Sequence, residues 1–136
     1  MEGSGAFWDD LARELEDPEF LREYVAESVR IAAIDDMVNA LDDARVAVGL
    51  SKAELARAIQ VQPATIRRLF ASKKSNPTLG TLAELAAVLG MRVTLEPLSD
   101  QERAQITEPL LAGSSSNPGG LARHLDRLRT RSRASV

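Results

Sequence analysis

The chain of 136 residues contains no cysteine. That absence excludes a disulfide framework and a thiolate metal site, and it suits a reducing compartment. Aromatic residues make up only 4% of the chain, so a hydrophobic core must be built from leucine, isoleucine, valine and alanine. There is also no run of about 18 apolar residues, so we expect no membrane span.

Targeting and catalytic signals are also lacking. The opening residues, MEGSGAFWDD, are acidic and have neither the basic nor the apolar region of a signal peptide, so the expected location is the cytoplasm. We find no nucleophile–base pair, glycine-rich phosphate loop or metal-ligand cluster. The single histidine, His124, falls in a weakly patterned segment. We therefore expect no enzyme, no cofactor and no metal.

The formal charge of -3 is unevenly distributed. Residues 1–48 hold 13 acids and 4 bases, a balance of -9. Residues 49–98 hold 3 acids and 7 bases, and residues 99–136 hold 4 acids and 6 bases, balances of +4 and +2. Such a split suggests that one segment meets a polyanion, although surface charge also varies by chance.

Helical signals cover the first half of the chain. An amphipathic helix is expected over about 7–16. Asp17-Pro18-Glu19 then starts a second one, with a capping side chain, a proline at the first helical position and an acid at the positive dipole end. Apolar residues at helical spacing continue to Val48, and Gly49 is a typical C-terminal stop. The pattern leaves open whether this segment is one helix or two, with Asp35 capping the second.

Three shorter helices are predicted next. Ser51 and Glu54 form a capping-box pattern at the start of the first. Pro63 begins the second after a turn that has room for few residues. Thr78 caps the third, which ends at Gly90.

The period changes after Gly90. Residues 91–96, MRVTLE, alternate between apolar and polar, and Pro97 follows, which predicts a short strand. A lone strand is not stable, and the chain shows no second one. Its simplest partner is the same strand of a second copy, and the alternative is an extended coil packed on the helices.

The C-terminal segment has weaker signals. Residues 112–120 are composed mainly of glycine, serine, asparagine and proline, and this composition predicts a flexible linker. Beyond it, Leu121, Leu125 and Leu128 fall on one stripe of a short basic helix. Such a helix would be frayed if it stood alone in water.

The residues from Ser51 to Phe70 have the pattern of a helix-turn-helix. Ala56 is small where the two helices must approach, and Ile66 is spaced to close the same core. In this motif the second helix enters the major groove of DNA. Arg67 and Arg68 lie on that helix, and the guanidinium fork matches guanine O6 and N7. The alternative is that the two arginines only solvate a helix.

The sequence GLSKAELARAIQVQPATIRRLFASKKSNPTLGTLAELAAVLGM, with its flanks from about Met37 to Met91, resembles the Cro/phage-repressor type of domain. The resemblance implies an all-α protein with a five-helix helix-turn-helix domain, an N-terminal helical extension and a short C-terminal strand. The expected divisions are an acidic helical extension at 1–34, the DNA-binding domain with its strand at 35–98, and a flexible basic tail at 99–136.

The resemblance also implies roles for individual residues on double-stranded DNA. It places Lys52 on a phosphate, and Gln62, Pro63 and Ala64 at the tip of the recognition helix. Thr65, Arg67 and Arg68 match positions facing the groove. Lys73 and Lys74 match backbone-contacting positions in the following loop, although lysines are common in loops.

This chain departs from the family pattern at the turn and at the helix tip. A glutamine often stands where this chain has Pro63, so adenine reading from that position is lost. Ala64 offers only a methyl contact to thymine. A glycine is frequent where Gln60 stands, so Gln60 is expected in a left-handed conformation at some energetic cost. Specificity would then depend more on the arginines and on DNA shape.

The flanking segments resemble antitoxins. ELEDPEFLREYVAESVRIAAIDDMVNALDDARVAVGLS is similar to the N-terminal part of HigA-type antitoxins, and MRVTLEPL to the dimer strand of HipB-type antitoxins. The strand residues are Arg92, Val93, Thr94, Leu95 and Glu96. The resemblance implies a homodimeric repressor that neutralises a cognate toxin and autoregulates its operon. The alternative is a protein-interaction adaptor, or toxin neutraliser, with little DNA binding.

Overall fold

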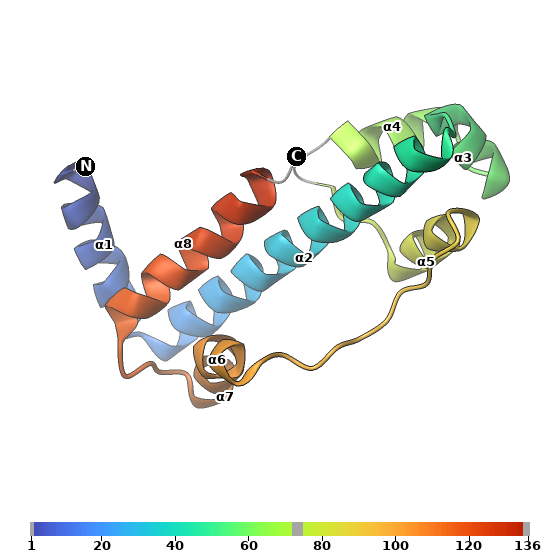
Figure 1. Ribbon diagram of the computed structural model, residues 1–136. Helices are drawn as coiled ribbons and strands as arrows, with labels where there is room; N and C mark the ends of the chain where they lie inside the picture. Colours follow the sequence, from blue (N-terminus) through green and yellow to red (C-terminus); the bar gives the residue numbers. More distant parts are fainter. Residues whose placement is uncertain (1, 72–74, 135–136) are drawn as a thin grey trace. The chain divides into compact units, whose positions relative to one another are not determined.

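The computed structural model describes residues 2–71 and 75–134, and all regular secondary structure in them is helical (Figure 1). The chain divides into two compact units. The central unit is Ile34–Leu95. The terminal unit combines the residues up to Ala33 with Glu96–Ala134.

The long helix α2, Pro18–Val48, starts in the terminal unit and ends in the central one. The Phe20 backbone N–H donates to Asp17 Oδ2 at 3.1 Å, so Asp17 caps the helix as predicted. The sequence between Glu19 and Val48 has no glycine or proline to break it. The question left open by the sequence is thus answered, because the segment is one helix.

The terminal unit contains the start of α2 and helices from both ends of the chain. α1 is Glu2–Glu14 and packs on α8, Pro118–Ala134. Between them in sequence come α6, Asp100–Glu102, the π-helical turn η1, Arg103–Thr107, and α7, Glu108–Ala112. The buried side chains of its core are Leu11, Leu15, Leu21, Val25, Ala32, Ile106, Leu121, Ala122, Leu125 and Leu128.

The segment expected as a flexible basic tail, 99–136, differs in the structure over its described residues. Leu121, Leu125 and Leu128 do form one apolar stripe, as the pattern indicated, but the stripe is buried against the N-terminal helices. Burial of each leucine stabilises the folded state by about 1.5–3 kcal/mol. α8 would be unstable alone, and its packing against the N-terminal helices, which are far away in sequence, supplies the missing stability.

Arginines add polar contacts within the terminal unit. Arg22 donates from Nε to the Leu110 carbonyl and from Nη2 to the Leu111 carbonyl, both at 2.9 Å. These acceptors are orphan carbonyls at the end of α7, which the guanidinium satisfies. Arg129 donates from Nε to Ser28 Oγ at 2.9 Å, and its guanidinium lies 4.5 Å from the centre of the Tyr24 ring.

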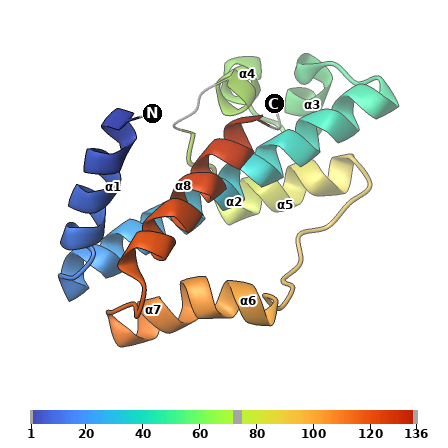
Figure 2. The same cartoon turned by 60° about the vertical axis from the view of Figure 1, so that its left-hand side comes forward.

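The central unit holds the end of α2 and three short helices. They are α3, Lys52–Ala58, α4, Pro63–Ala71, and α5, Leu79–Val88. α3 packs against both α4 and α5 (Figure 2). Their buried side chains are Val38, Leu41, Leu55, Ala56, Ile66, Leu69, Leu82, Leu85, Ala86 and Leu89. Ala56, Ile66 and the capping residues Ser51 and Thr78 take the places that the sequence predicted.

The strand predicted at 92–96 is not a strand in this structure. Residues 91–99 have no regular secondary structure, and no strand occurs within 2–71 and 75–134. A single chain offers this segment no partner, and a strand needs hydrogen bonds from a second strand. Over the same residues, no helix combines the length and the apolar character needed to cross a membrane.

Candidate nucleic-acid interface

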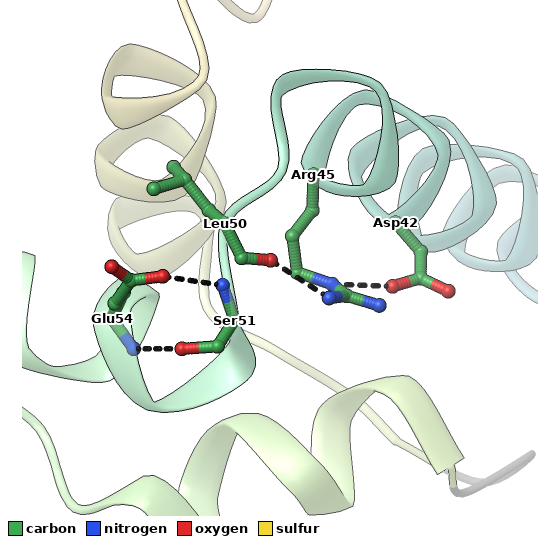
Figure 3. Close-up of polar contacts among 5 residues, drawn as sticks. All are labelled: Asp42, Arg45, Leu50, Ser51 and Glu54. Carbon is green, nitrogen blue, oxygen red and sulfur yellow. Dashed lines mark hydrogen bonds and ion pairs between the residues drawn. The ribbon is translucent and has the colours of Figure 1, made fainter.

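The entry to the helix-turn-helix is fixed by Arg45 at the end of α2 (Figure 3). Arg45 Nε donates to Asp42 Oδ1 and Nη1 donates to the Leu50 carbonyl, both at 2.9 Å. Gly49 has a φ of +78°, and the Leu50 N–H bonds back to the Arg45 carbonyl at 3.1 Å. This left-handed helix end turns the chain sharply, and the Arg45 side chain holds the turn.

The start of α3 is a complete capping box. The Glu54 N–H donates to Ser51 Oγ at 3.0 Å, and the Ser51 N–H donates to Glu54 Oε1 at 2.8 Å. The hydrogen bond from the Ser51 backbone, with a smaller contribution from its hydroxyl, holds the pKa of the Glu54 carboxyl below its ordinary value. The predicted capping box is confirmed.

The turn between α3 and α4 depends on Gln60. Its φ is +61°, the one positive φ at a residue other than glycine within the described chain. The Val61 N–H bonds to the Ala56 carbonyl at 2.9 Å, and the Gln60 N–H to the Arg57 carbonyl at 3.2 Å. This is a Schellman motif with glutamine at the position that favours glycine. The prediction for Gln60 is confirmed, and the conformation costs about 1–2 kcal/mol.

Helix α4 presents two arginines to solvent. Ile66 and Leu69 are buried against α3 and α5 and fix the rotation of the helix. Arg67 and Arg68 are exposed, and no hydrogen bond or ion pair joins either guanidinium to another group in residues 2–71 and 75–134. Their directions differ by about 100° around the helix. The two charges are therefore available to an anion outside the chain.

The other predicted DNA contacts occupy the surfaces around this helix. Lys52 is the first residue of α3 and is half-buried. Gln62 is exposed just before α4, while Ala64 and Thr65 are half-buried in its first turn. Lys73 and Lys74 lie outside the described residues. The roles of all these side chains on DNA stay predictions.

Sequence reasoning missed a pocket beside α4. It has a volume of about 380 Å³ and is bounded by α4, by residues 75–78 and by the first turn of α5. Its lining residues are Thr65, Arg68, Leu69, Ser75, Asn76, Pro77, Thr78 and Thr81. The sequence predicts Thr78 only as a helix cap.

Comparison with known proteins agrees with this geometry. Residues 41–95 match the family described as "Helix-turn-helix". Neither the curated proteins nor the solved structures that were compared give a significant match. The matched segment holds the end of α2, all of α3, α4 and α5, and the extended residues that follow. Residues 41–95 thus form a helix-turn-helix domain similar to that of the Cro/phage-repressor (XRE) family, and this match supports a DNA-binding transcriptional regulator.

Proposed function

We propose that the protein is a sequence-specific transcriptional repressor that inserts α4 into the major groove of its operator. The observation that carries this proposal is the pair of exposed arginines, Arg67 and Arg68, without partners in the described chain. Charge supports it as well. Residues 34–95 carry 8 bases and 6 acids, whereas the rest of the chain carries 9 bases and 14 acids. Of the two units, the central one, which holds the recognition helix, has the positive net charge.

We also propose that the repressor acts as a homodimer. Residues 92–96 of two copies would pair as antiparallel strands, because this segment has no regular secondary structure of its own and its residues lie exposed. Leu95 is 96% exposed, and the neighbouring Val93 borders an apolar groove of about 190 Å³ between α2 and α5. Burial of such side chains would stabilise a dimer, and two recognition helices would then reach half-sites about one turn apart.

The proposal is tested by fluorescence anisotropy with two labelled duplexes, the gene's own upstream region and a scrambled version of it. Titrations at several salt concentrations give the affinity for each and the number of phosphates neutralised. We expect the upstream duplex to bind about a thousandfold more tightly or better. Equal, weak binding to both duplexes would contradict a sequence-specific regulator. Light scattering after gel filtration tests the dimer, and a monomer at micromolar concentration would exclude it.

A second candidate function is neutralisation of a basic toxin, as the antitoxin of a type II toxin–antitoxin pair that autoregulates its operon. The supporting observation is the acidic excess of the terminal unit, 14 acids against 9 bases outside residues 34–95. Two arginines of the basic C-terminal segment, Arg129 and Arg123, contact Ser28 and the Trp8 ring within this unit, so that segment is less available to a partner than its sequence suggested. Charge therefore favours the acidic N-terminal helices as the contact.

Co-expression with the product of the neighbouring gene tests this second function. A complex that survives purification, together with rescued growth, would support it, and failure of both would exclude it. If a complex forms but the upstream duplex is not bound, the protein is an interaction adaptor or neutraliser rather than a repressor.

A further inference from the structure

The pocket beside α4 brings a cationic side chain together with hydroxyl and amide groups. Arg68 is the one charged residue among the described residues that line it, and none of these carries a carboxylate. Thr65, Ser75, Asn76, Thr78 and Thr81 add hydroxyl and amide groups. A volume of about 380 Å³ is large enough for a hydrated group, since one water takes about 30 Å³ in the liquid.

The hydrogen bonds already made in the pocket leave donors for a ligand. Thr78 Oγ1 accepts from the Thr81 backbone N–H at 3.1 Å and donates its hydroxyl hydrogen to Thr81 Oγ1 at 3.0 Å. The Thr81 hydroxyl accepts in this pair, so its own hydrogen can be donated to a ligand in the pocket. The Arg68 guanidinium likewise has no partner in the described chain. Both are donors, which an anion requires.

The two arginines of α4 differ in their relation to the pocket, because Arg68 lines it and Arg67 does not. Thr65 and Arg68 are three positions apart, so they share an edge of the helix, and both line the pocket. Arg67 does not line it and points about 100° away. Arg68 is thereby placed beside the hydroxyl and amide groups of residues 75–81, and Arg67 is left to the open side of the helix.

We propose that this pocket binds a phosphate of the DNA backbone through Arg68 and Thr81, while Arg67 reads bases. The inference rests on the proposed DNA-binding function and divides its two arginines by role. A phosphate contact fixes the register of the recognition helix on the duplex but carries no sequence information, whereas a bidentate contact to guanine does.

The experiment is anisotropy on single variants of the full chain, with the upstream and scrambled duplexes over a range of salt concentrations. Arg68→Ala should weaken binding to both duplexes by the same factor and lower the slope of log K against log salt by about 1. Arg68→Lys should keep that slope, because a point charge serves a phosphate. Arg67→Ala and Arg67→Lys should both reduce the ratio between the duplexes, about fivefold or more for the loss of a bidentate contact.

Thr81→Val keeps the shape of the side chain and removes only its hydroxyl. It should weaken both duplexes equally, by about twofold to tenfold. Thr107→Val, in the terminal unit, is the matched control and should change neither affinity. Denaturant unfolding of each variant confirms that the fold is kept.

Two results would overturn the inference. If Arg68→Ala lowers the preference for the upstream duplex and leaves the salt slope unchanged, Arg68 reads a base. A second contradicting result combines two measurements. If inorganic phosphate alone raises the melting temperature of the wild type but not of Arg68→Ala, and Arg68→Ala binds both duplexes as tightly as the wild type, the pocket binds free phosphate instead of a DNA phosphate. Either result leaves the regulator proposal intact, which fails only when the wild type does not distinguish the duplexes.

Discussion

The arginines of the two units differ in whether they have a partner within the protein. In the terminal unit, Arg22 and Arg129 bind carbonyl and hydroxyl oxygens, and Arg123 lies 5.0 Å from the centre of the Trp8 ring. In the central unit, Arg67 and Arg68 contact no partner in residues 2–71 and 75–134. An arginine that is already hydrogen-bonded stabilises a fold, while an unpartnered one is available to a polyanion. The charge count of a segment therefore does not by itself reveal a binding surface.

Arg45 shows that the role of an arginine depends on its own hydrogen-bond partners and not on the unit in which it lies. It lies in the central unit, but its side chain is only 17% exposed and it binds Asp42 and the Leu50 carbonyl. We assign it to the architecture of the motif and not to DNA. The same reasoning removes the C-terminal Arg129, which is 18% exposed and bonded to Ser28, from the candidates for an external partner.

The largest predicted effect tests whether α8 belongs to the terminal core. Leu125 is fully buried there, so Leu125→Ala should lower the free energy of unfolding by about 2–5 kcal/mol. Leu111→Ala is the matched control, because Leu111 is 77% exposed, and it should stay within about 0.5 kcal/mol of the wild type. Urea unfolding followed by circular dichroism measures both. Equal, small effects would mean that α8 is the loose tail that its sequence suggests.

The next effect concerns the structural arginines. Arg129→Ala removes the bond to the fully buried Ser28 and the contact with Tyr24, and should cost about 1–3 kcal/mol. Arg127→Ala, on the same helix, removes a guanidinium with no hydrogen bond or ion pair within the described residues and should cost less than about 0.5 kcal/mol. Neither substitution should change DNA affinity. If both are equally harmless, the terminal unit does not depend on the half-buried Arg129.

A smaller effect is expected in the turn of the motif. Gln60→Gly should stabilise the protein by up to about 1 kcal/mol, because glycine relieves the left-handed strain while losing more backbone entropy on folding. Gln62→Gly should give no such gain, since Gln62 does not have a positive φ. Thermal unfolding of both variants decides the matter, and a loss of stability in Gln60→Gly would show that the turn needs the glutamine side chain.

The smallest effect is a pH dependence of the capping box. The folded pKa of Glu54 is lowered, so its contribution to stability is complete above the unfolded pKa of about 4.3 and is lost as pH falls through the folded pKa. We therefore expect the melting temperature of the wild type to exceed that of Glu54→Gln at neutral pH. The difference should shrink under acid conditions. A difference that stays constant down to acid pH would contradict a role for the charged carboxylate.

Local signals made the motif predictable. The boundaries of α3, α4 and α5 follow from caps, prolines and glycines within a few residues of each helix end, such as Ser51 and Pro63. The strain at Gln60 was visible because the family pattern places a glycine there. Roles on DNA, in contrast, cannot follow from such signals, because they depend on a partner outside the chain.

Long-range packing explains what the sequence did not reveal. Arg129 binds Ser28 across 101 positions and Arg22 binds Leu110 across 88, and no local period announces either pair. The leucine stripe of α8 was readable, but the surface that covers it was not. The pocket beside α4 was missed for the same reason, because the sequence does not show that Ser75 and Thr81 lie close to Arg68.

The most direct test of the central claim is the double variant Arg67→Ala/Arg68→Ala, measured for both stability and binding. Neither side chain has a partner in the described chain, so the free energy of unfolding should change by less than about 0.5 kcal/mol. Anisotropy with the upstream duplex should show that specific binding is lost. Unchanged binding to that duplex by the folded double variant would contradict the account, because the two arginines would then only solvate a helix.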